Sequence, residues 1–250
     1  MVWEPRRYRQ GAHSSDLVSF EIVHGETDLM VSALRDCSAE AAAAVAEIRA
    51  DLEAYIGVHP RFAESFTPVE VTPDAPEIVR AMAAAGAAAG VGPMAAVAGA
   101  VAERVARALA PVSPEVLVEN GGDLFVAGSV ERHVLLLAGD SPLSGRLAIA
   151  LSAGSLPCAV CTSSGKVGHS VSLGVAHAVT VLAAEGAIAD AAATAAGNLV
   201  HGPADVERAL ERALAVPGVR GAVVIAGDTV GALGDVTLVP VDSERPSVPL

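Results

Sequence analysis

The order of short apolar runs and longer helical segments is the feature that most constrains the fold of this chain. Between residues 16 and 35, Val18, Phe20 and Ile22 alternate with polar residues, a polar turn follows, and the alternation resumes. This pattern predicts a β-hairpin. Later strand-like runs are mixed with helical segments, without strict strand–helix alternation. The order favours an α+β fold with mixed or antiparallel sheets and packed helices, in one compact domain spanning residues 1–241.

The periodicity also gives approximate boundaries for the individual elements. We expect Ser38 to cap the first helix and residues 60–76 to form an irregular, proline-rich connection. Residues 242–250 read as a disordered tail. The expected helices lie at about 38–56, 75–89, 94–109, 186–199 and 203–215. The expected strands after the hairpin lie at about 116–118, 124–127, 133–138, 147–151, 159–162, 176–183, 219–226, 229–232 and 236–240.

Composition limits the kinds of partner. Hydrophobic residues make up 52% of the chain but aromatic residues only 3%, so the core must be built from many small, closely packed side chains. The formal net charge is −13 and Lys166 is the only lysine. A protein that binds nucleic acid needs a basic face. We therefore expect a small-molecule ligand and no nucleic-acid partner.

A membrane partner is not expected either. The most apolar stretch, residues 81–102, contains glycines and Pro93, and Glu103 and Arg104 follow it directly. A membrane-spanning helix needs about 20 continuous apolar residues. Residues 1–10 are polar and no apolar signal segment follows them, which favours the cytoplasm. The alanine-rich stretch is compatible with a homo-oligomer and equally with burial inside the chain.

The first motif is a glycine-rich start to a helix, at residues 89–99. Gly92 and Pro93 precede Met94 and a run of alanines that ends at Gly99. Glycines let the backbone approach a ligand closely, and free amides at a helix start favour an anion. The alternative is close packing against another helix or a sheet. The motif is not a P-loop, because it lacks the Gly-Lys-Ser/Thr ending.

The second motif follows a short apolar strand. It comprises Glu119, Asn120, Gly121, Gly122 and Asp123. Two adjacent glycines permit backbone angles that other residues avoid, and the polar groups are expected at a strand end, where binding sites often lie. The alternative is a plain type I′ hairpin turn, which does not by itself require a carboxylate at position 119.

The third motif is a polar loop in which hydroxyls and backbone amides can hold phosphate oxygens. His169 is a candidate acid or base near neutral pH. The alternative is an ordinary flexible loop. The loop residues are Thr162, Ser163, Ser164, Gly165, Lys166 and His169.

The fourth motif places Asp190, Thr194 and Asn198 four residues apart in an alanine-rich helix. This spacing puts all three on one helix face. Oxygen ligands of this kind suit a hard cation. The alternative is a solvated stripe, although such stripes usually carry Lys, Glu and Arg.

Cys158 and Cys161 form a lone CxxC sequence. In a strand, residues three apart face opposite sides, so a disulfide between them is disfavoured. One pair also cannot complete a tetrahedral zinc site. We interpret both as buried structural cysteines, with Cys161 as the one more apt to border a site.

These motifs, in this order, resemble the ApbE-like superfamily of FAD:protein FMN transferases. That family has a Gly-rich helix start, a strand ending in Asn-x-Gly-Gly-Asp, a Thr-Ser-Gly loop, a histidine segment and a helix with Ala-Asp-Ala-x-Ala-Thr. The resemblance covers about residues 75–200. It is closer to a UPF-type branch with the forms Gly-Pro-Met-Ala-Ala-Val-Ala-Gly, Val-Glu-Asn-Gly-Gly-Asp, Gly-His-Ser and Asp-Ala-Ala-Ala-Thr.

The resemblance implies an ApbE-like fold and a set of residue roles. Asp190 and Thr194 would bind a metal ion, with Mg²⁺ expected. The residues from Asn120 to Asp123 would contact a nucleotide or flavin, FAD or FMN, and the loop from Thr162 to Gly165 would lie at its phosphates. The chain departs from the transferases after His169, because Ser170, Val171 and Ser172 stand where they have Ile-Ile-Asp-Pro-x-Thr-Gly. The transferases' helix lysine and Met-Gly-Thr segment are also missing.

The sequence thus leads to three hypotheses about function. The first is metal-assisted transfer or hydrolysis at a phosphoanhydride, with His169 or Asp123 moving protons. The second is a non-catalytic cofactor-binding protein. The third is a redox subunit that acts on an anionic aromatic substrate.

Overall fold

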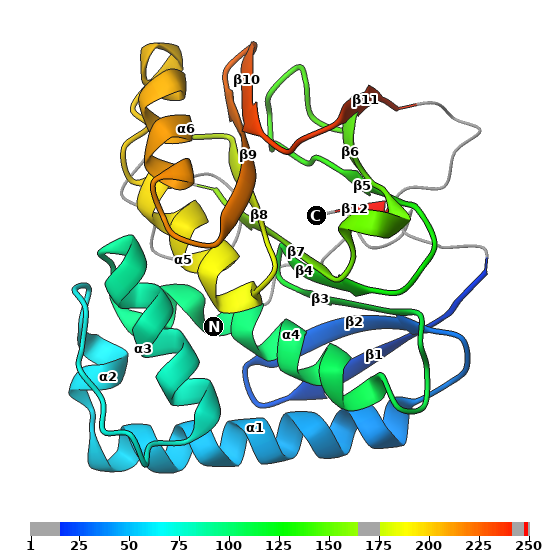
Figure 1. The fold of residues 1–250 in the computed structure, drawn as a ribbon, viewed down its shortest axis with the longest axis vertical. Helices are drawn as coiled ribbons and strands as arrows, with labels where there is room; N and C mark the ends of the chain where they lie inside the picture. Colours follow the sequence, from blue (N-terminus) through cyan, green and yellow to red (C-terminus); the bar gives the residue numbers. More distant parts are fainter. Residues whose placement is uncertain (1–15, 165–175, 242–247, 250) are drawn as a thin grey trace.

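A computed structural model describes residues 16–164, 176–241 and 248–249 of the chain. Its centre is an eight-stranded sheet in which every neighbouring pair is antiparallel (Figure 1). In spatial order the strands are β1 (Val18–His24), β2 (Thr27–Ala33), β3 (Val116–Asn120), β4 (Asp123–Ala127), β7 (Cys158–Ser163), β8 (Ala178–Ala183), β9 (Val219–Ala226) and β10 (Thr229–Gly234).

A smaller sheet of four strands packs on one face of the large one. Its order is β11 (Leu238–Pro240), β6 (Leu147–Leu151), β5 (Arg132–Leu135) and β12 (Val248–Pro249). β12 pairs in parallel with β5, opposite Val134 and Leu135. These two residues of the C-terminal tail are therefore in a strand, where a disordered tail was expected.

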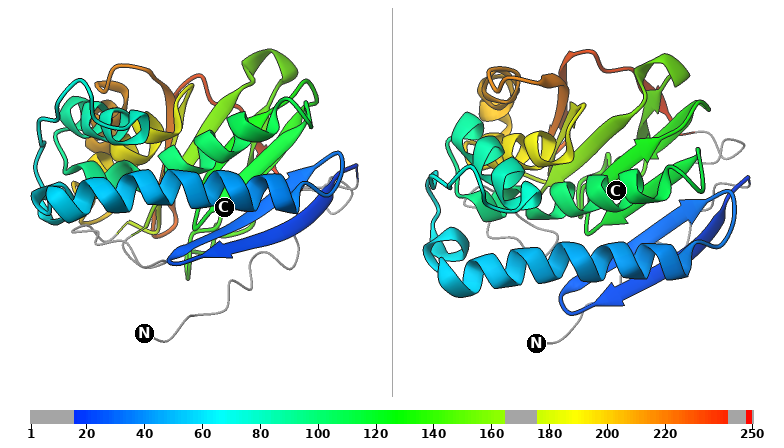
Figure 2. Two further views of the ribbon diagram at one scale, coloured as in Figure 1. Left: turned by 90° about the horizontal axis from the view of Figure 1, so that it is seen from below. Right: turned by 60° about the horizontal axis from the view of Figure 1, so that its bottom comes forward.

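Helices cover the other face of the large sheet (Figures 1 and 2). α1 runs alongside the β1–β2 hairpin, and α5 lies over β7 and β8. The helices are α1 (Ser38–Val58), α2 (Arg61–Glu64), α3 (Glu77–Ala89), α4 (Val97–Leu109), α5 (Gly186–Gly197) and α6 (Val206–Leu214). The 3₁₀ turns are η2 (Pro93–Ala96), η3 (Ala153–Ser155) and η4 (Pro203–Asp205).

Both faces of the central strands β3, β4, β7, β8 and β9 are buried, which explains why these strands are almost continuously apolar. In β3, Val116 and Val118 face the helices, whereas Leu117 faces the small sheet. In β4, Phe125 faces the helices and Leu124 faces the small sheet. The mixed α+β architecture with antiparallel sheets in one compact domain agrees with the prediction from the sequence.

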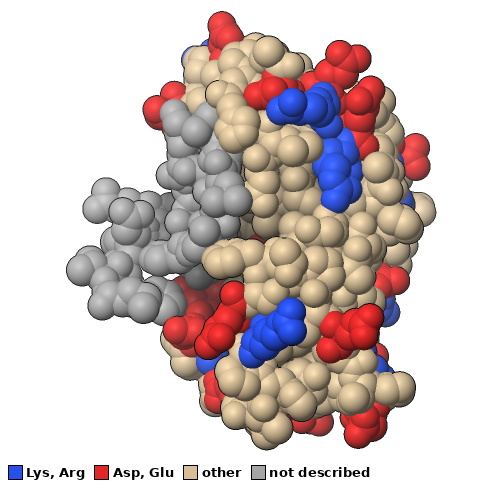
Figure 3. Space-filling model, turned by 90° about the vertical axis from the view of Figure 1, so that its left-hand side faces the viewer, with Lys and Arg blue, Asp and Glu red and all other residues tan. Residues whose placement is uncertain are grey.

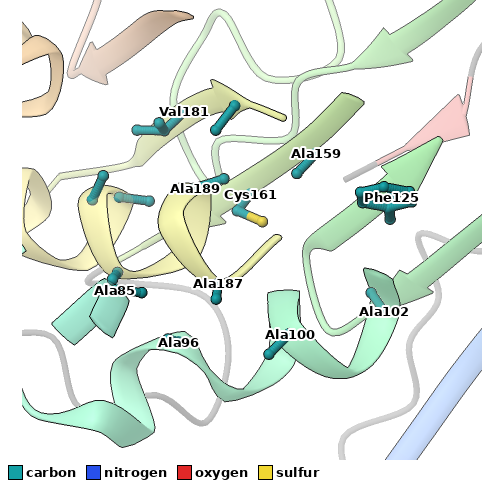
Figure 4. Packing of buried hydrophobic residues seen from close by; sticks show 14 of the residues in the cluster. Ala85, Ala96, Ala100, Ala102, Phe125, Ala159, Cys161, Val181, Ala187 and Ala189 are labelled. Atoms are coloured by element: carbon teal, nitrogen blue, oxygen red, sulfur yellow. The ribbon is translucent and has the colours of Figure 1, made fainter. Parts of the chain in front are cut away.

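The core on the helix side is assembled largely from alanine, as composition predicted. The close approach of α4, α5 and β7 is visible in Figure 4. Small side chains allow backbones to come near one another, so many short contacts replace a few large rings. The buried alanines labelled there are Ala85, Ala96, Ala100, Ala102, Ala159, Ala187 and Ala189.

Two local expectations were wrong. The connection at 60–76 contains the short helix α2, which buries Phe62. Ser38 lies inside α1 rather than capping it, and its backbone amide donates a hydrogen bond to the Asp36 carboxylate at 2.9 Å. The Asp36 carboxylate, two residues before Ser38, therefore accepts from the first amide of α1 in place of a Ser38 side-chain cap.

Within the described ranges, no single helix is long and apolar enough to cross a membrane. Only α3 and the segment Pro93–Leu109 taken together reach that length and apolar character, and the two are bent by 103° relative to each other.

Candidate functional site

The polar stripe on α5 sits in a buried helix. Asp190, Thr194 and Asn198 are each partly exposed, while the alanines between them are buried against the core. Nothing in this setting resembles the solvated face of a surface helix. Asp190 and Thr194 share one face of α5 because they are four residues apart, and Asn198 directly follows the last residue of the helix.

The Asp190 carboxylate caps the first turn of the neighbouring helix α4. Its Oδ2 accepts a hydrogen bond from the Gly99 backbone amide at 3.0 Å. Gly99 is the third residue of α4, where backbone amides lack partners within the helix. The sequence suggested that amides at this helix start bind an external anion. The Gly99 amide instead donates to a carboxylate of the chain itself.

Glycine allows α4 and α5 to touch backbone to backbone. A Cβ placed on Gly99 would lie 2.3 Å from the Gly186 carbonyl oxygen, and one placed on Gly186 would lie 2.1 Å from the Gly99 carbonyl oxygen. Glu103 of α4 accepts a hydrogen bond from the Gly186 amide at 2.6 Å. The close-packing interpretation of Gly99 therefore agrees with the structure.

Gly92 has a similar packing requirement. A Cβ placed on it would lie 1.8 Å from the Ser65 carbonyl oxygen. Gly92 is buried and Pro93 occupies the first position of η2, as the sequence predicted. Met94, which follows Pro93, is partly exposed.

Asp123 lies at the start of β4 and is only 6% exposed. Its Oδ1 atom is buried and has no hydrogen-bond partner among the described residues. Burial, followed by the charge of nearby Asp190, raises the pKa of Asp123 well above its usual range. Burial likewise raises the pKa of Asp190 to about 7, against the hydrogen bonds from the amides of Gly99 and Ala98. Two carboxylates that disfavour each other's charge form an environment suited to a cation.

The turn between β3 and β4 is a two-residue hairpin turn. Gly121 and Gly122 have φ of +68° and +107°, which only glycine adopts without strain. Glu119 is buried, and its Oε1 accepts a hydrogen bond from the Gly122 amide at 3.0 Å. Asn120 donates from Nδ2 to the Ala98 carbonyl oxygen at 3.2 Å. The hairpin interpretation is thus structurally correct, and the polar residues of the turn reach α4 and the turn itself.

The described part of the third motif extends β7 next to this turn. The Thr162 amide donates to the Gly122 carbonyl oxygen at 3.1 Å, and the hydroxyls of Thr162 and Thr180 lie 2.8 Å apart. Ser163 is buried near Gly197 of α5. Ser164 donates a hydrogen bond to the His177 carbonyl oxygen at 2.8 Å. Gly165, Lys166 and His169 lie outside the described residues.

Sequence reasoning missed His177, which directly precedes β8. Its Nδ1 accepts a hydrogen bond from the Gly227 amide at 3.0 Å, and its Nε2 lies 3.1 Å from Asp140 Oδ1. These contacts join three loops at one end of the large sheet. A histidine just before an apolar strand was the available indication, but its partners are far away in the sequence.

The two cysteines of the CxxC sequence face opposite sides of β7, as their spacing predicted. Cys158 lies in the core below the small sheet and Cys161 in the core below the helices. Both are free thiols, and burial raises the pKa of each. Cys161 pairs with Asp123 across β4 and β7, so it does border the carboxylate pair.

Oxygen donors at this site fit a magnesium ion better than a soft metal. Within the described part of the chain, no three His, Cys, Asp or Glu side chains come together as a metal-holding group. Mg²⁺, however, typically takes one or two carboxylates and completes its shell with waters and substrate phosphates. Asp190, the Thr194 hydroxyl and the unpartnered Oδ1 of Asp123 are consistent with that donor set.

The surface shown in Figure 3 carries its arginine side chains in separate patches among acidic and uncharged residues. No continuous basic area appears among the described residues on that face. The absence of a nucleic-acid partner stays a prediction from the net charge.

Comparisons with known proteins agree with this architecture. The family model described as AbpE bacteria matches residues 9–233. The UPF0280 protein of Methanopyrus kandleri is 45% identical over 225 residues, covering 87% of this chain and 91% of the relative. The UPF0280 protein of Methanocaldococcus jannaschii is 45% identical over 193 residues, covering 75% and 78%.

Solved structures show the same fold at low sequence identity. The flavin transferase ApbE from Vibrio cholerae superposes with a TM-score of 0.56 at 12% identity, covering 87% of this chain and 96% of that one. The Pseudomonas stutzeri flavinyl transferase ApbE in its apo form gives a TM-score of 0.51 at 16% identity, covering 87% and 94%. The chain shares the fold of the ApbE flavin transferases, and it belongs to the AbpE bacteria family, with the UPF0280 proteins as its relatives.

Proposed function

We propose that this protein binds a small phosphorylated or anionic ligand of the flavin-nucleotide class, FAD or FMN, through a Mg²⁺ ion held by Asp190 and Thr194. The observation that carries the proposal is the pair Asp123 and Asp190. Asp123 has a buried oxygen that finds no hydrogen-bond partner in the described part of the chain, and each carboxyl group has a raised pKa. A divalent cation would satisfy that oxygen and offset the two like charges.

The surroundings support a ligand with an apolar ring and an anionic part. Met94 and Ala95 are partly exposed next to α5, and Asn120 and Thr162 are partly exposed at the ends of β3 and β7. The apolar side chains of Met94 and Ala95 can contact a flat ring, while the Thr162 hydroxyl can contact polar substituents. The ApbE relatives are flavin transferases by name, which points to the same ligand class.

If the protein is an enzyme, the proposed chemistry is transfer or hydrolysis at a phosphoanhydride. A bound Mg²⁺ ion would supply neutralisation of charge on phosphate oxygens. Burial raises the pKa of Asp123 well above its usual range, which favours the protonated form of this carboxyl group. It is therefore suited to act as an acid, with His169 as the other proposed proton-transfer residue.

The test is ligand binding with and without Mg²⁺. We expect FAD or FMN to raise the melting temperature only when Mg²⁺ is present, because a ligand of the native state stabilises it by mass action. Asp190→Asn and Thr194→Val should abolish the Mg²⁺ dependence. Asp51→Asn, on the exposed side of α1, is a matched control that should behave as the wild type.

Two results would decide against the proposal. One is an equal FAD shift in Mg²⁺ and in a chelator. The other is an Asp190→Asn variant that keeps the full Mg²⁺ dependence. Chromatography of FAD incubated with Mg²⁺ and protein then separates enzyme from carrier, since hydrolysis with water yields FMN and AMP, whereas a cofactor-binding protein returns intact FAD.

A further inference from the structure

One peptide group at the start of α4 is held at both of its ends by side chains of the candidate site. The Ala98 carbonyl oxygen accepts a hydrogen bond from Asn120 Nδ2 at 3.2 Å. The Gly99 amide, on the other side of the same peptide bond, donates to Asp190 Oδ2 at 3.0 Å. Asn120 and Asp190 thus act on one rigid, planar unit from opposite sides.

The two hydrogen bonds reinforce each other. A donor at the carbonyl oxygen polarises the peptide group, so its N–H becomes a stronger donor. The acceptor is a carboxylate, for which such bonds are stronger than between neutral groups. The Asn120 side chain therefore strengthens the bond that fixes the Asp190 carboxylate, although the two side chains approach different atoms.

The position of Asn120 also couples the two carboxylates. Asn120 ends β3 and pairs across the hairpin with Asp123 at the start of β4. The same end of the hairpin thus places Asp123 in the site and, through Asn120, hydrogen-bonds the peptide group that orients Asp190. A shift of the hairpin against α4 would move both carboxylates relative to each other.

We propose that Asn120 is a positioning residue for Asp190, acting through the Ala98–Gly99 peptide group, rather than a direct contact of the ligand. The inference rests on the proposed function, because the property that Asn120 sets is the cation affinity of Asp190. Groups that hydrogen-bond to a metal-binding carboxylate commonly change metal affinity by about 10–100-fold when they are removed. Asn120 reaches Asp190 only through the Ala98–Gly99 peptide group. We therefore expect its removal to weaken cation affinity by about tenfold, the lower end of this range.

The experiment compares Asn120→Ala and Asn120→Ser in the full-length protein. Hydrogen exchange of the Gly99 amide, followed by NMR without any metal, reports on the peptide group directly. Mn²⁺ titration followed by electron paramagnetic resonance reports on cation affinity. Asn120→Ala should speed Gly99 exchange and weaken Mn²⁺ binding about tenfold, whereas Asn120→Ser, which keeps a donor, should lose less.

Two further variants sharpen the result. Asn120→Ala added to Asp190→Asn should speed Gly99 exchange by less than the two single effects combined, because both act on one peptide group. Ser19→Ala removes a side-chain hydrogen bond between Ser19 and Ser32 in the β1–β2 hairpin and should leave Gly99 exchange and Mn²⁺ affinity unchanged.

The outcomes separate this inference from the proposed function. Wild-type exchange at Gly99 and wild-type Mn²⁺ affinity in Asn120→Ala would overturn the positioning role. Loss of FAD binding with unchanged Mn²⁺ affinity would also overturn it and would identify Asn120 as a ligand contact. A wild-type protein that binds no Mn²⁺ would instead remove the proposed function, while the exchange data would still show whether Asn120 orders the Asp190 contact.

Discussion

Glu103 and Asp190 each accept a hydrogen bond from the first turn of the helix that carries the other. Glu103 of α4 binds the Gly186 amide of α5 at 2.6 Å, and Asp190 of α5 binds the Gly99 amide of α4 at 3.0 Å. The backbones of Gly99 and Gly186 touch between these two contacts. The start of each helix is therefore fixed by the other, and the candidate metal-binding carboxylate is part of that arrangement.

The cap formed by Glu103 should contribute measurably to stability. We expect Glu103→Ala to lower the free energy of unfolding by about 1–2 kcal/mol, because the Gly186 amide loses its acceptor. Glu103→Gln keeps an acceptor oxygen and should cost less. Urea unfolding measures both. Glu53→Ala, which removes the exposed Arg49–Glu53 ion pair on α1, is the matched control, and an equal cost in the two alanine variants would argue against the cap.

The backbone contact between α4 and α5 should not tolerate a methyl group. Gly99→Ala places a Cβ 2.3 Å from a carbonyl oxygen of the partner helix, so the helices must move apart. We expect a loss of about 1–3 kcal/mol or more. Gly57→Ala in α1 meets nothing within 4 Å and should stabilise by about 0.5–1 kcal/mol. Thermal unfolding of the two variants should therefore shift in opposite directions.

The contribution of Asp190 to the stability of the metal-free protein should fall as the pH rises from about 4 to 7. The pKa of Asp190 is about 7 in the folded protein and 3.8 as its ordinary value, so across this range the folded state retains a proton that the unfolded chain has released. Asp190 therefore adds most to the free energy of unfolding below pH 4. This contribution of Asp190 is lost above pH 7. The raised pKa of Asp123 acts in the same direction.

Denaturant unfolding at several pH values in a chelator tests this dependence. The pH slope should be smaller in Asp190→Asn, because one of the two titrating groups is gone. At pH 8, Mg²⁺ should restore stability to the wild type, since a cation offsets the charge that burial disfavours. A wild-type stability that rises steadily between pH 5 and 7 would contradict the assignment.

The cysteines should be unreactive in the folded protein. Cys37, Cys158 and Cys161 are all buried, and burial raises the pKa of the two in β7. The thiolate is the reactive form, so both access and ionisation oppose modification. We expect a thiol reagent at pH 8 to modify none of the three within minutes, and all three in urea. Rapid labelling of Cys161 in the native protein would show that the site opens beside Asp123.

Local patterns predicted much of the fold and the local setting of several candidate-site residues. The alternation at residues 18–33, the two adjacent glycines at 121 and 122, and the spacing of Asp190 and Thr194 each depend on neighbours in the sequence. Such features follow from backbone geometry and helix periodicity, which act over a few residues.

The rest depends on contacts between distant segments. The amides at the start of α4 looked open to an anion, but Asp190 reaches them from a helix formed much later in the chain. The hydrogen bond from Asn120 to Ala98 could not be foreseen for the same reason, because Ala98 lies in another element. Nothing in the local sequence marks which polar group will be satisfied from within the protein.

The pairing of β2 with β3 has a consequence for folding kinetics. Ala33 lies opposite Val116, although all of α1, α2, α3 and α4 intervene in the chain. Closing so long a loop costs conformational entropy before any contact between the two strands offsets that cost. We therefore expect this pairing to form late in folding. The β1–β2 hairpin and α1 should accordingly open first in native-state hydrogen exchange, while the interlocked helices around Glu103 and Asp190 remain protected until global unfolding.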